Sequence, residues 1–244
     1  MSRPTNRQSR SVGNLGDILK HAALVELATL LAGESAAVSF VDTHTFLLHA
    51  PPGDLERWNR EVADLASRHP SYAGYAARER ASLARTDHYR CSSGLVIDAL
   101  GDRRVRAVLG EANGVTRAEL RDQIASESLP DVVIVDDAAA VDRFGSVLNG
   151  GTLLVHVDPF ALTPEIWAPL VPALDAISAR SANAIFVVYR YSRTARTKWP
   201  APPAGTSGPI TETRGGPHEL AAYASPAIAE AVQSVCGALG WRIW

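Results

Sequence analysis

Acidic residues at the ends of apolar runs are the first candidates for chemistry in this chain. Four of its apolar runs, at 36–42, 105–111, 131–137 and 151–158, end in carboxylates, which are Asp42, Glu111, Asp136 with Asp137, and Asp158. In open α/β sheets ligands bind outside the carboxyl ends of the strands, so these side chains are expected to point towards one crevice. A single strand-end aspartate often caps a turn or a helix instead. Four of them together predict a functional site.

Two histidines and a lysine stand in short polar segments near the N-terminus. Lys20 and His21 belong to GNLGDILKH at 13–21, and His44 belongs to VDTHT at 41–45. Imidazole titrates near neutral pH, so either histidine could serve as an acid or a base, although a packed histidine is the commoner case. His44, His49 and an aspartate follow no common metal-ligand spacing, and we expect no metal.

A group of cations follows the last apolar run. Its members lie in YRYSRTARTK at 189–198 and are Arg190, Arg193, Arg196 and Lys198. Arginine binds sulfate or phosphate oxygens in pairs, so Arg190 and Arg193 are predicted to contact an anionic group of a substrate. A solvated basic face, or a patch for RNA phosphates with bases stacked on the interleaved tyrosines, explains the same pattern.

Strands and helices that could position these side chains alternate along the chain. The four runs above and a fifth at 183–191 predict strands buried on both faces of a mainly parallel sheet. Helical spacing is found at 17–32, 118–127, 166–180 and 226–240. This alternation predicts an α/β fold with helices on both faces of the sheet.

Two segments interrupt the alternation. Residues 52–100 contain two charged helical stretches and predict a small helical insertion above the sheet. Residues 197–218 are rich in proline and glycine, which predicts a flexible loop that is ordered by a substrate or a partner subunit. We expect one domain over 1–244 that carries both segments.

Composition limits the class of protein. The 244 residues are 46% hydrophobic and carry a net charge of −2, which favours a globular domain and gives no general reason to expect a nucleic-acid partner. Cys91 and Cys236 form no C-x-x-C pattern, so a reducing cytoplasm is expected. Neither a signal core nor a membrane helix is apparent. Abundant alanine and a strong excess of arginine over lysine are typical of a GC-rich bacterial genome.

The short motifs resemble those of the bacterial 23S ribosomal RNA adenine-N6 methyltransferases. The family's G-N-x-x-D-x-L-K-H segment is matched by Gly13, Asn14, Asp17, Leu19, Lys20 and His21. Its L-D-T-H segment resembles the residues at 41–44, and its D-P-P-Y segment resembles those at 158–160. The order and spacing of the three segments cover most of the chain.

This resemblance implies a fold and a set of site residues. The fold is a Rossmann-like, methyltransferase-type, mainly parallel sheet with a small helical insertion. Asp42 and Glu111 are expected to flank S-adenosylmethionine, with Asp136 near its adenine. Asp158 is expected to accept a hydrogen bond from the target amine. The remaining residues that the resemblance places in the site are Asn14, Asp17, Lys20, His21 and Phe160.

The chain departs from the family at two places. The family has A-G-A-G after D-T-H, where glycines let the backbone approach the cofactor. Here Thr45, Phe46, Leu47 and Leu48 follow instead, with side chains where the cofactor needs space. In the second departure one proline is missing, so the aromatic side chain of Phe160 is displaced by one position.

Together these features predict a methyltransferase-like scaffold that acts on a small molecule without S-adenosylmethionine. Asp158 would orient an amine and take its proton, with His21, Lys20 and His44 as further catalytic groups. The electrophilic carbon would belong to the substrate, which gives intramolecular displacement or elimination of sulfate or phosphate, as in a cyclase or lyase of specialised biosynthesis. Two alternatives remain. One is an S-adenosylmethionine-dependent RNA methyltransferase with a divergent cofactor loop, and the other is a non-catalytic scaffold for a partner protein.

Overall fold

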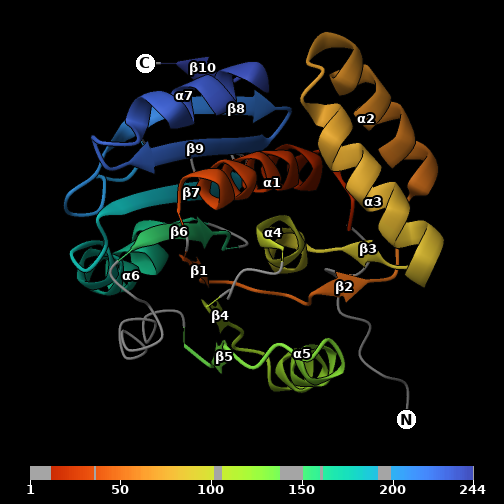
Figure 1. Ribbon diagram of the computed structural model, residues 1–244, viewed down its shortest axis with the longest axis horizontal. Helices are drawn as coiled ribbons and strands as arrows, with labels where there is room; N and C mark the ends of the chain where they lie inside the picture. The colour runs from red at the N-terminus through yellow and green to blue at the C-terminus, as the bar shows by residue number, and fades with distance from the viewer. Residues whose placement is uncertain are drawn as a thin grey trace.

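An eight-stranded sheet forms the centre of the part of the chain that the computed structural model describes (Figure 1). The described ranges are 12–35, 37–101, 106–137, 151–159, 162–191 and 199–243. The strand order across the sheet is β10-β8-β9-β7-β6-β1-β4-β5. The strands are β1 (Val38–Asp42), β4 (Arg106–Gly110), β5 (Val132–Val135), β6 (Thr152–Val157), β7 (Asn183–Tyr191), β8 (Ser207–Gly215), β9 (His218–Ala224) and β10 (Arg242–Ile243).

The directions of the strands give the sheet its class. From β5 through β4, β1 and β6 to β7 every neighbouring pair is parallel. Next to β7, strand β9 runs antiparallel, and β8 pairs antiparallel with β9. β9 is therefore inserted antiparallel between β7 and β8, which run in the same direction as the other strands from β5 to β7. The predicted α/β class is therefore confirmed, and all five predicted strands are present.

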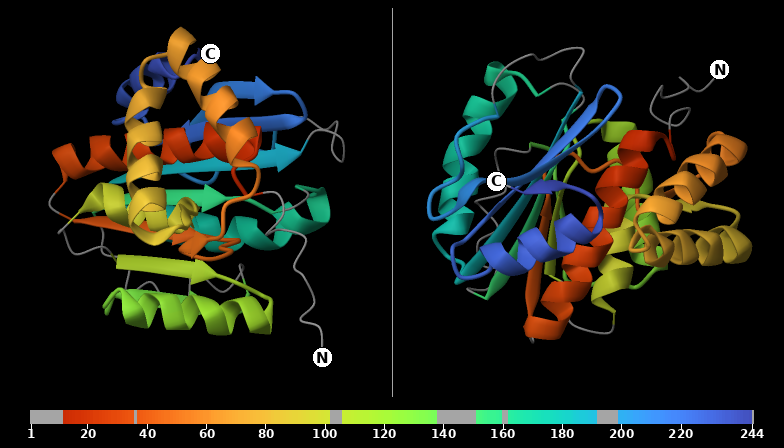
Figure 2. Two further views of the ribbon diagram at one scale, coloured as in Figure 1. Left: turned by 90° about the vertical axis from the view of Figure 1, so that its right-hand side faces the viewer. Right: turned by 90° about the horizontal axis from the view of Figure 1, so that it is seen from above.

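Helices cover both faces of the sheet, which explains why the central strands are apolar throughout. Figure 2 shows α6 on one face and α1 with α4 on the other. Along β6, Leu154 packs into the core on the α1 side and Val155 packs into the core on the α6 side. The helices are α1 (Leu15–Glu34), α2 (Leu55–Arg68), α3 (Tyr72–Thr86), α4 (Ser92–Leu100), α5 (Gly114–Ser126), α6 (Pro164–Ser178) and α7 (Ala229–Ala238).

Helix α1 is the element that carries the first motif into the molecule. It is apolar on nearly all sides because it lies between the sheet and the helical insertion. Its N-cap is Asn14, whose side-chain oxygen accepts hydrogen bonds from the backbone N–H groups of Gly16 (2.7 Å) and Asp17 (3.3 Å). The cap fixes the first turn, so the polar residues of this turn project from a rigid helix end.

The helical insertion is smaller than the sequence predicts. Helices α2 and α3 stand outside α1 (Figure 1). A short antiparallel pair, β2 (His49–Ala50) with β3 (Tyr89–Arg90), joins the segment before α2 to the segment after α3. Helix α4 also lies within the predicted range 52–100. However, α4 packs against α1 in the layer that covers the sheet, so it is the crossover helix between β1 and β4.

The expected flexible loop at 197–218 is wrong over much of its length. Residues 207–215 form β8, and β9 begins at His218. Proline and glycine suggested irregular structure, but β8 is a partly exposed antiparallel strand whose ladder is supplied by β9 and β10. The described remainder of the segment, 199–206 and 216–217, does lack regular structure.

No helix within the described ranges combines the length and the apolar character that a membrane span requires.

Candidate active site at the carboxyl ends of the strands

A cavity of about 480 Å³ opens beside the N-terminal end of α1, at the carboxyl ends of β1 and β6. Side chains from β7, β9 and α2 complete its wall. Seven residues that the sequence predicted for the site line it, and these are Asn14, Asp17, Lys20, His21, Asp42, His44 and Asp158. Its size is within the range of small-molecule sites.

Lys20 connects two carboxylates at the floor of this cavity. Its ammonium nitrogen lies 2.5 Å from Oδ2 of Asp158 and 2.9 Å from Oδ1 of Asp17. Burial alone would lower the pKa of Lys20, but the two carboxylates outweigh this effect and hold that pKa well above its usual value. Lys20 is therefore a fixed ammonium group that positions Asp158.

Asp17 is itself held by the turn before α1. Its Oδ2 atom accepts hydrogen bonds from the backbone N–H of Gly13 (2.8 Å) and from the side-chain amide of Asn14 (3.1 Å). Burial would raise the pKa of Asp17, but the charge of Lys20 lowers it overall. Gly16 is required here because a Cβ atom at this position would overlap the ring of His218. The G-N-x-G-D segment thus builds a rigid support for Lys20.

Asp42, the last residue of β1, lies in a second buried polar group. The hydroxyl of Ser93 donates to its Oδ2 atom at 2.7 Å, and the backbone N–H of His44 donates to Oδ1 at 3.3 Å. Burial would raise the pKa of Asp42, but His156 and these two donors hold it below its usual value. Asp42 is therefore a carboxylate at neutral pH.

His156 was not predicted from the sequence, yet it lies between two strand-end acids. The side chain is fully buried in β6, with Nδ1 3.3 Å from Asp42 and Nε2 3.9 Å from Asp158. Neither ring nitrogen makes a regular hydrogen bond within the described ranges. The sequence gives no sign that His156 belongs to the site, because this residue stands between two valines in an otherwise apolar strand.

His21 does not fit its predicted role as an acid or base near neutral pH. The ring lies 3.2 Å from the hydroxyl of Ser92 through Nε2 and 3.4 Å from the hydroxyl of Tyr89 through Nδ1. Burial, with the adjacent charge of Lys20, lowers the pKa of His21 to about 3. The ring is consequently neutral and acts as a hydrogen-bonding wall of the cavity.

This burial predicts a measurable pH dependence of stability. His21 stays neutral in the folded protein down to about pH 3, whereas the unfolded chain takes up a proton below about pH 6.5. Stability is therefore lost as the pH falls through this window, by about 1.4 kcal/mol per pH unit. Urea denaturation between pH 7 and 4.5 should show a smaller slope for His21→Gln than for the unmodified protein. Equal slopes would contradict the assignment.

His44 is also largely buried at the cavity wall. Its Nδ1 atom lies 2.7 Å from the hydroxyl of Thr43. Burial lowers its pKa, although the carboxylates of Asp158 and Asp42 oppose the shift. His44 is therefore neutral at pH 7 and can accept or donate a hydrogen bond in the cavity.

The loop after β1 takes the place of the glycine turn. The backbone N–H of Thr43 donates to the carbonyl of His156 at 3.0 Å, and that of Thr45 donates to the carbonyl of Gly110 at 2.7 Å. The chain thereby crosses the ends of β6 and β4. Phe46 and Leu47 line the cavity, and Leu47 is nearly fully buried. Phe46 thus stands where the similar motif has its first glycine, and Leu48, which is buried, stands where it has the second.

Three predicted site residues lie outside the cavity. Glu111 is half-buried and accepts a hydrogen bond from the backbone N–H of Asn113 at 2.6 Å, and Asp136 is exposed. The crevice expected to hold four strand-end acids thus holds only the acids of β1 and β6. Arg190 pairs with Glu219 at 2.6 Å and lies over the ring of Trp199 at 3.9 Å.

Two other predicted site residues cannot be placed. Phe160 and Arg193 lie outside the residues that the structure describes.

Four polar residues that β7, β9 and α2 contribute to the cavity were not predicted as site residues. Tyr189 and Tyr191 come from β7, His218 from β9 and Arg57 from the insertion helix α2. The hydroxyl of Tyr189 lies 2.8 Å from Nδ1 of His218, and the Lys20 ammonium lies 5.5 Å from the Tyr189 ring centre. The tyrosines were read only as neighbours of the arginines, while His218 fell in the expected loop.

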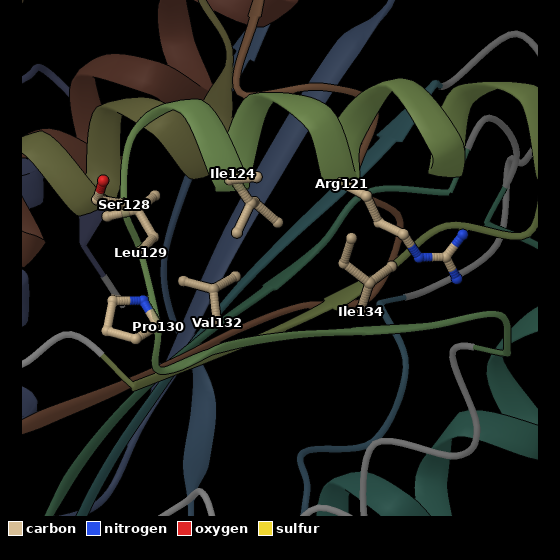
Figure 3. Close-up of a pocket in the computed structure, with 8 residues that line it drawn as sticks. Arg121, Ile124, Ser128, Leu129, Pro130, Val132 and Ile134 are labelled. Atoms are coloured by element: carbon tan, nitrogen blue, oxygen red, sulfur yellow. The ribbon is translucent and has the colours of Figure 1, made fainter.

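A second hollow, of about 570 Å³, lies at the far edge of the sheet. Figure 3 shows Arg121 and Ile124 of α5 facing Val132 and Ile134 of β5. Apart from Arg121 its lining has no charged side chain. It therefore lacks the groups for acid–base chemistry. Nowhere in the described ranges do three histidine, cysteine or acidic side chains form a metal-binding group.

Comparison with known proteins finds a solved structure that is similar over nearly the whole chain. Neither a family model nor a curated protein matches the sequence. Protein LPL1258 of Legionella pneumophila, assigned to the family DUF519, is 13% identical; the match covers 96% of this chain and 97% of that protein, with a TM-score of 0.60. At this identity the similarity shows a shared fold alone.

Other solved structures are similar at lower scores. Escherichia coli yhhF, provisionally named a methyltransferase, is 14% identical over 83% of this chain and 85% of its own, with a TM-score of 0.45. HI0767 of Haemophilus influenzae, provisionally named a methylase, is 11% identical over 82% and 85%, with a TM-score of 0.43. The match to LPL1258 shows that this chain shares that protein's fold. In this chain the mainly parallel α/β sheet carries a polar cavity at the carboxyl ends of its strands.

Proposed function

We propose that the protein is an enzyme that catalyses an intramolecular displacement. An amine of a small-molecule substrate attacks a carbon of the same molecule and replaces the leaving group on that carbon. The observation that carries this proposal is the geometry of Asp158, a carboxylate on the cavity wall that is fixed by the ammonium of Lys20. The contacts of Asp158 with Lys20 and His156 both involve Oδ2. Its Oδ1 atom can therefore accept the N–H of a substrate amine.

The proposed reaction is balanced without an external methyl donor. The nitrogen lone pair forms a bond to a carbon of the same molecule, and the bond from that carbon to a sulfate or phosphate oxygen breaks. The leaving oxyanion takes the bonding electrons, and Asp158 takes the proton from nitrogen. Holding the amine in line with the carbon–oxygen bond is the main contribution of the cavity.

The loop after β1 supports a reaction without S-adenosylmethionine. A cofactor of this kind needs glycines that let the backbone approach it closely. Phe46 and Leu48 stand at the two glycine positions, and Phe46 lines the cavity together with Leu47. Glu111 and Asp136, which the family resemblance implies as cofactor contacts, lie outside the cavity. We therefore infer that the space is used by the substrate.

Access to Asp158 favours an enzyme over a non-catalytic scaffold. Its side chain is 15% exposed and faces the cavity, so a small molecule can reach it. A scaffold role would leave unexplained why three carboxylates and a lysine are kept on the wall of an open cavity, because buried charges lower stability unless they are well paired.

Calorimetric titration with S-adenosylmethionine tests this proposal against methylation. We expect no binding heat at millimolar cofactor. The probe 2-aminoethyl hydrogen sulfate, which carries an amine and a sulfate ester on adjacent carbons, should release inorganic sulfate in the presence of the protein. Tight cofactor binding without sulfate release would favour the S-adenosylmethionine-dependent methyltransferase instead.

A further inference from the structure

The cavity has two side-chain cations among the described residues that line it, and they differ in how closely acids pair with them. Lys20 is held between Asp17 and Asp158. The other cation is Arg57, in the first turn of α2. The three histidines of the wall add no charge at neutral pH because burial lowers the pKa of each of them, and these are His21, His44 and His218.

Arg57 is held in place by its backbone, whereas its side chain, which is 40% exposed, makes only a long ion pair. Asp54 caps α2 by accepting the backbone N–H of Arg57 at 2.9 Å. The nearest acid to the side chain is Glu61, whose Oε1 atom is 3.9 Å from Nε, too far for a hydrogen bond. The buried Nε atom has no hydrogen-bond partner within the described ranges. Buried N–H groups are seldom left unpaired, so an acceptor is expected to occupy this position.

The charged side chains of the cavity come from different elements. Asp17 is on α1, Asp42 ends β1, and Asp158 directly follows β6. The charges of Asp17, Lys20, Asp158 and Arg57 all influence the pKa of His218, which lies on the same wall. Arg57 brings a positive charge from the insertion. Such a cavity is complementary to a molecule with an amine at one end and an anion at the other.

We propose that Arg57 is an anion subsite that binds the sulfate or phosphate ester group of the substrate. This inference rests on the proposed function and narrows it to aminoalkyl sulfates or phosphates. A guanidinium can hold two oxygens of a tetrahedral oxyanion at once and stabilise the negative charge that grows on the leaving group. The helical insertion thereby gains a role, since it supplies the group that selects the substrate.

Titration with sodium sulfate and, separately, inorganic phosphate tests the subsite without a known substrate. Both titrations are made by calorimetry at constant ionic strength. Arg57→Gln should weaken binding of the preferred anion by about 10- to 100-fold, as expected for the loss of a charge-assisted pair. Arg60→Gln, on the exposed face of the same helix, is the matched control and should bind as the unmodified protein does. The anion that binds with the higher affinity indicates whether the substrate is a sulfate ester or a phosphate ester.

Two results would overturn the subsite. One is unchanged affinity in Arg57→Gln, and the other is an equal loss in Arg60→Gln, which would indicate general surface charge. If Arg57→Gln does not fold, Arg57→Lys replaces it and should retain the charge while losing part of the affinity. Failure of the subsite is distinguishable from failure of the proposed function, because sulfate release from 2-aminoethyl hydrogen sulfate would persist in the first case and be absent in the second.

Discussion

Replacement of Lys20 by methionine is expected to lower the free energy of unfolding by about 3–5 kcal/mol, the usual effect of removing one partner from a buried ionic group. Only 11% of the Lys20 side chain is exposed, and its ammonium lies between Asp17 and Asp158. Methionine has a similar volume, so the packing of α1 changes little and the loss reports on charge. Urea denaturation at pH 7 measures it, with Arg60→Met as an exposed control that should stay within about 0.5 kcal/mol.

The pH dependence of this difference follows from the shifted pKa values. The pKa of Lys20 is raised by folding, so its contribution is complete below the unfolded value of 10.5 and is lost only as the pH rises through the higher folded value. The pKa of Asp17 is lowered, so its contribution is complete above 3.8 and is lost as the pH falls through the folded value. The difference between Lys20→Met and the unmodified protein should be largest between these limits. A loss below about 1 kcal/mol at pH 7 would refute the network, since it is no more than an exposed pair contributes.

The central sheet could be predicted because its strands are buried on both faces. Continuous apolar runs are visible without knowledge of their partners, and β1, β4, β5, β6 and β7 all follow from them. Strand β8 could not be predicted in this way. Its segment, Ser207–Gly215, is polar and contains glycine and proline, and its strand conformation depends on pairing with β9 and with β10 near the end of the chain. Local sequence does not carry such distant pairings.

The candidate site was predictable where neighbouring parallel strands end together. β1 pairs with β6 in parallel, so Asp42 and Asp158 lie close together at the carboxyl ends of these two strands. Glu111 and Asp136 follow β4 and β5, which lie on the side of β1 away from β6, β7 and β9. Their strand-end position is correct, but the cavity is built on the other side. The acids at the strand ends do not show the order of the strands in the sheet, and this order decides which of the acids border the cavity.

Arg57 could not be predicted for a related reason. On α2 the buried positions are Trp58, Val62 and Leu65, so the helical pattern assigns Arg57 to a solvated charged face. The side chain reaches the cavity only because the insertion folds back beside α1. When a site is formed by an inserted subdomain together with the carboxyl ends of strands, the sequence predicts its elements but not which of their side chains meet.

Replacement of Asp158 by asparagine should reduce the rate of sulfate release from 2-aminoethyl hydrogen sulfate by about 10²–10⁴-fold, the usual contribution of a positioned general base. The asparagine oxygen can still accept the hydrogen bond from Lys20, so the geometry of the cavity is kept while the proton acceptor is lost. The loss should appear in kcat with little change in KM, because the anion end of the substrate is bound elsewhere.

A matched control separates this effect from general damage. Asp122→Asn, on the exposed face of α5, should retain full activity. A cooperative unfolding transition of Asp158→Asn in urea would exclude a folding defect, even though the loss of the charged pair with Lys20 lowers its stability. Full activity of Asp158→Asn would refute the role of Asp158 as the proton acceptor. In that case the remaining acceptor at the same edge is Asp42, which is fully buried and already holds the donors Ser93 and His44. Because Asp42 has less freedom to meet a substrate, Asp158 is the carboxylate on which the proposed reaction depends.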